Sequence, residues 1–130
     1  MKSAGWAGYI NVLYLATGKR QRVKNSILDA GLGLTSELWL GLTSEVFSTL
    51  QIEDGVGGTL AKALSGSYAI AGNETTVTST ASFTSGEVSF DVVTVALIGS
   101  LGTRIAEATV DIPSGNAVEI TREDLLSEVV

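Results

Sequence analysis

Apolar and polar residues alternate along most of the second half of the chain. Within 75–83, Val77, Ala81 and Phe83 alternate with threonine and serine, and 106–112 and 118–120 repeat the pattern. Successive side chains of a strand point to opposite faces, so a period of two predicts strands with one polar face. Between 88 and 98 the apolar residues move from even to odd positions, which indicates a β-bulge or a strand buried on both faces.

The N-terminal third has a different period. Apolar residues between 9 and 30 recur every three or four positions, which is helical spacing, and Gly18 interrupts the run. We expect a helix over Lys19 to Ala30, with Gly31 as its C-terminal cap. The alternation at 38–43 predicts a strand, 43–58 a long surface excursion, and 60–64 and 68–71 further short strands.

Short segments of alternating residues, separated by Gly and Ser turns about every ten residues, are typical of antiparallel sheets. We therefore predict a mainly β fold: an antiparallel β-sandwich, jelly-roll-like, with one N-terminal helix. The expected organisation is an N-terminal arm and helix (1–36), a β-sandwich domain (37–122) and a C-terminal tail (123–130).

The 130-residue chain contains no histidine and no cysteine. Catalytic triads, cysteine nucleophiles, disulfides and zinc fingers are therefore excluded. The glycines at 31–33 and 55–58 lack the spacing of phosphate-binding loops, and the acidic residues lack the ligand pattern of an EF-hand. We expect a protein that is not an enzyme, with no catalytic residues, no metal and no cofactor, although a structural Ca²⁺ at 53–54, 111 or 123–124 stays a minor alternative.

The net charge of −6 argues against a nucleic-acid binder, but the charge is unevenly placed. Residues 1–30 hold five of the eight basic groups and one of the fourteen acidic groups. A basic segment on an acidic body is complementary to a second copy of the same chain, which favours a homo-oligomer. A solvated face of the predicted helix explains the same pattern equally well.

No apolar run reaches the roughly 18 residues that a membrane span needs. The longest, 6–16, contains Asn11 and precedes its basic cluster, which is the wrong order for a signal peptide. We therefore expect no membrane partner and synthesis in the cytoplasm. The aromatic, basic and C-terminal apolar residues are the candidate protein interface: Trp6, Tyr9, Tyr14, Arg20, Arg22, Leu125, Leu126 and Val129.

The order of several short motifs resembles a family of small structural proteins of tailed bacteriophages that are often described as tail-fibre-like. The motifs are a short N-terminal helix, LWLGLTS at 38–44, GGTLAK at 57–62, a Thr/Ala/Phe strand near 75–83, a Val-rich strand at 88–98, GTRIAEA at 102–108 and IPSGNAVEI at 112–120. The chain departs from the family in its longer basic N-terminal segment and its weaker match at 43–58.

This resemblance implies a β-sandwich subunit of a symmetric assembly in the virion, with no catalytic residues to carry over. The leading hypothesis is a component of the tail, neck or fibre base that binds itself and other virion proteins. A capsid decoration or cement protein is the alternative, and the sequence does not separate the two. A receptor- or glycan-binding module and a carboxylate-based glycan hydrolase are more distant possibilities.

Overall fold

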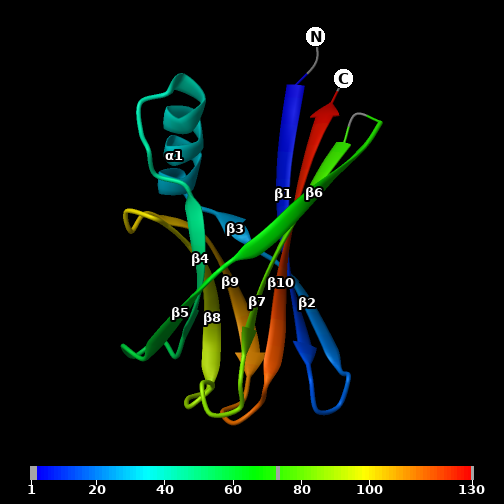
Figure 1. Ribbon diagram of the computed structural model, residues 1–130, viewed down its shortest axis with the longest axis vertical. Coiled ribbons are helices and arrows are strands. Elements are labelled where there is room, and N and C mark those ends of the chain that lie inside the picture. The colour runs from blue at the N-terminus through cyan, green and yellow to red at the C-terminus, as the bar shows by residue number, and fades with distance from the viewer. Residues whose placement is uncertain (1–2, 73, 130) are drawn as a thin grey trace.

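The computed structural model describes residues 3–72 and 74–129 (Figure 1). Over these residues the elements in chain order are β1 (Ser3–Tyr14), β2 (Arg20–Lys24), β3 (Ser26–Ile27), α1 (Asp29–Leu40), β4 (Phe47–Glu53), β5 (Thr59–Ala63), β6 (Ser65–Ala71), β7 (Glu74–Phe83), β8 (Val92–Gly99), β9 (Arg104–Ile112) and β10 (Val118–Val129).

The strands form two five-stranded sheets in which all neighbours are antiparallel. The first sheet has the order β2-β1-β10-β7-β6 and the second the order β3-β9-β8-β4-β5. The two sheets face each other, and α1 stands beside β4 at one end of the molecule (Figure 1). The predicted mainly β sandwich with one helix is confirmed.

Two bent strands join the sheets at both edges. β2 continues into β3 through the single residue Asn25, and β5 continues into β6 through Leu64. Each bend is fixed to the neighbouring strand by a backbone hydrogen bond: the backbone N–H of Asn25 donates to the carbonyl oxygen of Gly8, and that of Leu64 donates to the carbonyl oxygen of Ser48. Since β2 and β6 border the first sheet while β3 and β5 border the second, the chain passes directly from one sheet to the other at both edges of the sandwich.

The core between the sheets is apolar and fully buried. The first sheet contributes Ile10, Val12, Phe83 and Ile120 among others, and the second contributes Leu50, Ile52, Val95 and Ile112 among others. The alternation predicted for 75–83 and 106–112 is confirmed. Ala81 and Phe83 in the first segment, and Ala108, Val110 and Ile112 in the second, are buried in this core, while the residues between them are exposed. A shift in the β8–β9 register between 92 and 94 matches the predicted change of parity.

The N-terminal predictions are wrong in their secondary structure. Within the predicted helix over 19–30, residues 20–24 and 26–27 form β2 and β3. Helix α1 begins only at Asp29, so Gly31 lies inside it and is not a C-terminal cap, and it includes 38–40, half of the strand predicted for 38–43. Helical spacing in 9–16 also misled, since those residues belong to β1 and its turn. The reason is tertiary: β1 pairs with β10 along its whole length, which outweighs local periodicity.

The described residues of the segments predicted as an arm (1–36) and a tail (123–130) are part of the folded sandwich. They supply β1, β2, β3 and the end of β10, so the first sheet is built largely from the two ends of the chain. The predicted excursion at 43–58 contains β4, whose Leu50 and Ile52 are completely buried. Their alternation with Gln51 is the sequence signal for this strand.

Helix α1 packs closely on the second sheet at Gly31. A methyl group on Gly31 would collide with the backbone carbonyl oxygen of Ile105 in β9, whereas one on Gly33 would meet nothing within 4 Å. Both glycines lie in the same helix, and neither has a positive φ. Substitution at Gly33 therefore changes only the helix propensity of the residue, whereas substitution at Gly31 also disturbs the packing of α1 on β9.

We predict opposite effects of alanine at these two glycines. Gly33→Ala should raise the free energy of unfolding by about 0.5–1 kcal/mol, since alanine is the better helix former. Gly31→Ala should lower it by about 1–3 kcal/mol, since a backbone atom must move to admit the methyl group. Urea unfolding followed by circular dichroism measures both, and equal effects would contradict the close packing of α1 on β9.

Candidate functional site: an apolar cleft at the open end of the sandwich

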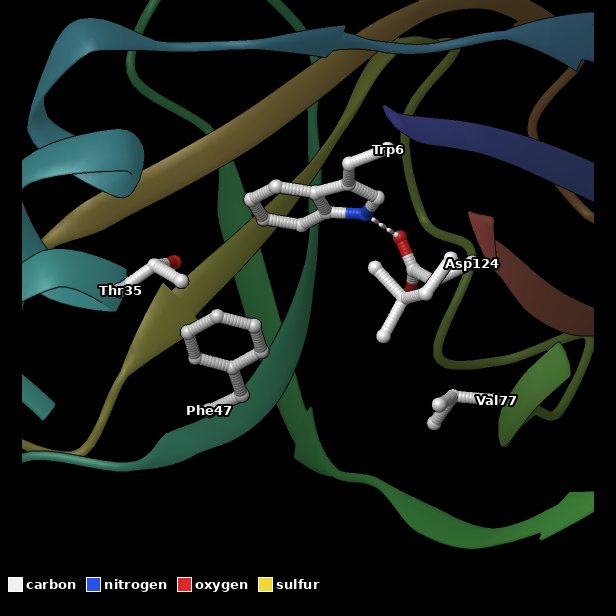
Figure 2. A pocket seen from close by; sticks show the side chains of 6 residues that line it. Trp6, Thr35, Phe47, Val77 and Asp124 are labelled. Carbon is white, nitrogen blue, oxygen red and sulfur yellow. Dashed lines mark hydrogen bonds between the residues drawn. The ribbon is translucent and has the colours of Figure 1, made fainter. Parts of the chain in front are cut away.

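The two sheets diverge at the end of the molecule where the chain termini lie (Figure 1). There β1, β6 and β10 of the first sheet stand opposite α1 and β4. Between them lies a cleft of about 180 Å³ (Figure 2). Its lining comes from five different elements and consists of Trp6, Thr35, Phe47, Val77, Asp124 and Leu126.

An aromatic pair spans the cleft. The rings of Trp6 from β1 and Phe47 from β4 are nearly parallel, with an interplanar angle of 12° and centroids 6.1 Å apart (Figure 2). Both side chains are partly exposed. Large aromatic rings with an accessible face are the residues that most often dominate the energy of protein interfaces.

The floor of the cleft is a buried ion pair. Asp124 accepts hydrogen bonds from Arg122 Nε and Nη2, both at 2.7 Å, and from Trp6 Nε1 at 2.8 Å. The Arg122 side chain is only 1% exposed. A buried charge is stable only when it is paired and hydrogen-bonded, so Asp124 both neutralises Arg122 and fixes the orientation of the Trp6 ring.

We predict that Asp124→Ala destabilises the protein by about 3–5 kcal/mol, because the variant leaves the Arg122 charge buried without a partner. The matched control is Glu123→Ala on the outer face of the same strand, where the ion pair with the exposed Arg22 is long, at 3.7 Å, and where Glu123 also accepts a hydrogen bond from Asn11 Nδ2 at 2.7 Å. That variant should cost about 1 kcal/mol or less. Thermal unfolding compares them, and similar losses would contradict the proposed role of Asp124.

Further exposed apolar side chains lie on two segments at this end of the molecule. Tyr68 and Ile70 lie on β6, and Leu42 and Val46 lie on the loop that joins α1 to β4. The backbone of Tyr68 pairs with that of Val77, so Tyr68 shares the face of the sheet on which the cleft opens. We call the cleft lining together with Tyr68 and Ile70 the open-end surface.

A buried carboxylate holds the loop between α1 and β4. Glu45 accepts hydrogen bonds from the backbone amides of Leu101, at 2.9 Å, and Thr103, at 3.0 Å, and from the Thr103 hydroxyl group. These bonds, the one from the Thr103 hydroxyl first, hold the pKa of Glu45 below its ordinary value. The carboxylate thus ties the loop that carries Leu42 and Val46 to the turn between β8 and β9.

Acid should weaken this attachment. The pKa of Glu45 is lower in the folded protein than in the unfolded chain, so its contribution is complete above the ordinary carboxyl pKa of 4.5 and is lost as the pH falls through the lower folded value. We predict that the free energy of unfolding falls as the pH drops below about 5 and that Glu45→Gln makes this fall shallower. Urea titrations at several pH values measure the slope, and an unchanged slope in the variant would contradict the assignment.

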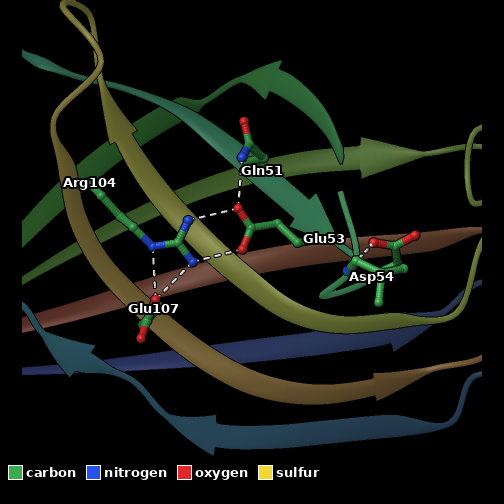
Figure 3. A network of polar contacts seen from close by, with 6 residues as sticks. Gln51, Glu53, Asp54, Arg104 and Glu107 are labelled. Carbon is green, nitrogen blue, oxygen red and sulfur yellow. Dashed lines mark hydrogen bonds and ion pairs between the residues drawn. The ribbon is translucent and has the colours of Figure 1, made fainter. Parts of the chain in front are cut away.

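A second polar network lies on the outer face of the second sheet (Figure 3). Arg104 Nη1 and Nη2 donate to the two carboxylate oxygens of Glu53, each at 2.7 Å, and Nε donates to Glu107 at 2.8 Å. The hydrogen bonds from Arg104 lower the pKa of Glu53. Both acids are thus bound to one guanidinium group, an arrangement that clamps β4 to β9 across β8.

The structure brings together two of the predicted interface residues. Trp6 and Leu126 are neighbours across β1 and β10 and both line the cleft. Leu125 lies on the next position of β10 and is half-buried. The backbone of Val129 pairs with Ser3, while its side chain lies outside the described part of the structure. The interface role of these residues stays a prediction.

The remaining candidates lie elsewhere on the first sheet. Arg22 on β2 covers the ring of Tyr9, with its guanidinium carbon 4.4 Å from the ring centroid, and Arg20 is exposed on the same strand. The Tyr14 hydroxyl group donates to the carbonyl of Asp111 at 2.6 Å, and burial together with the Asp111 charge raises the pKa of Tyr14. These four residues do not border the open-end surface.

Sequence reasoning missed three residues of the cleft lining: Thr35, Phe47 and Val77. They come from a helix and two strands that are distant from one another in the sequence.

Over the described residues, no cluster of three or more acidic, histidine or cysteine side chains is placed to hold a metal ion. Within the same residues, no helix is long and apolar enough to cross a membrane.

No protein-family model matches this chain, and neither a curated protein nor a solved structure does.

Proposed function

We propose that this chain is a structural protein that assembles with copies of itself and with other proteins, and that the open-end surface is its main contact. The observation that carries the proposal is the apolar cleft between Trp6 and Phe47, which is lined by the exposed Leu126 and by Val77, the strand partner of the exposed Tyr68. Soluble monomers rarely expose apolar surface in contiguous patches, and larger patches mark interaction sites.

The size of the cleft favours a protein side chain over a free small molecule. Sites for drug-sized ligands enclose roughly 300–1,000 Å³, and this cleft encloses about 180 Å³. Its polar floor is already engaged internally, because Asp124 accepts hydrogen bonds from both Arg122 and Trp6. An apolar side chain presented by another protein meets these conditions without leaving a buried polar atom unpaired.

The proposed setting is a tailed-phage particle, at the tail, neck or fibre base. This part of the proposal is supported by the resemblance of the segments 102–108 and 112–120 to small tail-fibre-like proteins. In the structure these segments form most of β9 and the turn into β10. Both sheets of the sandwich thus contain residues of these motifs.

We predict that Leu126→Lys weakens self-association about tenfold or more, because it places a charge in the centre of an apolar contact. Leu126 is 43% exposed, so the fold should tolerate lysine. Val56→Lys is the matched control, since Val56 is 90% exposed on the loop between β4 and β5, away from the cleft. Light scattering over a range of concentrations measures the mass.

The expected result is a wild-type mass above that of the 13.4 kDa chain, a lower mass for Leu126→Lys and an unchanged mass for Val56→Lys. A wild-type protein that stays monomeric at high concentration would overturn self-assembly. An equal effect of both lysines would show that added charge, rather than the open-end surface, controls the association.

A further inference from the structure

The two edges of the first sheet differ in their protection against pairing. β2, at one edge, carries three basic residues among five, whereas β6, at the other edge, carries neither charge nor proline among its seven residues. Soluble proteins normally guard an edge strand with charges, proline or bulges, because its free N–H and C=O groups bind other strands. By this criterion β2 is guarded and β6 is not.

β6 is also exposed on both of its faces. All seven residues from Ser65 to Ala71 are exposed, including Tyr68 and Ile70 at 72% and 69%. Its register with β7 is regular from Ser65 to Ala71, so the strand is fully formed and lacks a bulge that would twist its edge away. A fully formed, exposed and uncharged edge is suited to the addition of a further strand.

We propose that two copies of this chain join through β6, paired antiparallel about a two-fold axis at Tyr68. This inference rests on the proposed assembly function and names the contact between copies. The pairing would merge two five-stranded sheets into one sheet of ten strands. The Tyr68 and Ile70 side chains of both copies would then cover each other beside their clefts.

The chemistry of β6 favours a second copy as the occupant of its edge. About an axis at Tyr68, Ile70 of one copy lies opposite Gly66 of the other, so the largest aliphatic side chain of the strand meets the residue without one. The axis also places the two β6–β7 turns at opposite ends of the contact. The acidic Glu74 of each copy is therefore kept apart, and two chains of net charge −6 meet along an uncharged strand.

Charge substitutions at Tyr68 test both the strand and the register. In the proposed pairing Tyr68 faces its own counterpart, so Tyr68→Lys and Tyr68→Glu each bring like charges directly opposite one another and should weaken self-association about tenfold. An equimolar mixture of the two variants places lysine opposite glutamate and should restore association. Leu101→Lys is the control, because Leu101 has the same exposure of 72% on the turn between β8 and β9.

Sedimentation velocity on the wild type, the three variants and the mixture separates the outcomes. Loss in both Tyr68 variants, recovery in the mixture and no change in Leu101→Lys would establish the proposed contact. Wild-type association that survives in both Tyr68 variants would overturn the β6 pairing and leave the proposed function standing. A monomeric wild type would overturn both, and loss without recovery in the mixture would overturn the register centred on Tyr68.

Discussion

The structure depends above all on the pairing of its first and last strands. β1 and β10 are antiparallel from Ser3↔Val129 to Tyr14↔Val118, and β10 also pairs with β7. This pairing places Trp6 against Asp124, 118 residues away in the sequence, and so creates both the floor and one wall of the cleft. Because contacts between the two ends of a chain cost the most loop entropy, we expect them to form late in folding.

The same pairing explains why the interior is divided into two parts. Toward the turn ends of β1 and β10, inward residues such as Val12 and Ile120 are completely buried between the sheets. Toward the termini the inward positions are Trp6, Arg122 and Asp124, and there the second sheet gives way to α1. At this end of the sandwich a buried ion pair takes the place of further apolar core. Burying the two charges costs desolvation free energy, but the hydrogen bond from Trp6 to Asp124 fixes one rotamer of Trp6. That exchange is useful for presenting a rigid aromatic face.

The fold was predictable where burial follows a simple period. The segments around Phe83 and Val110 alternate cleanly because one face of each is in the core, and both were recognised as strands. The region 19–30 was not, since β2 is short, exposed at alternate positions and stabilised mainly by its neighbours. The cleft was only partly predictable. Trp6, as an aromatic residue, and Leu126, as an apolar residue near the C-terminus, were interface candidates from the sequence. Phe47 lines the cleft because it lies on β4, in a segment that the sequence predicted to be a loop.

The contrast between the two edges of the first sheet connects the charge pattern with assembly. The basic residues near the N-terminus are not an arm, because Arg20, Arg22 and Lys24 line one edge of a sheet. One of them makes contacts within the same chain: the Arg22 guanidinium group lies over the ring of Tyr9 and forms a long ion pair with Glu123. Charge at an edge prevents further strands from adding, so growth through that side is disfavoured. Under the proposed pairing, β6 joins two sheets and the charged β2 edge adds no further strand, so an assembly larger than two copies would use the apolar cleft.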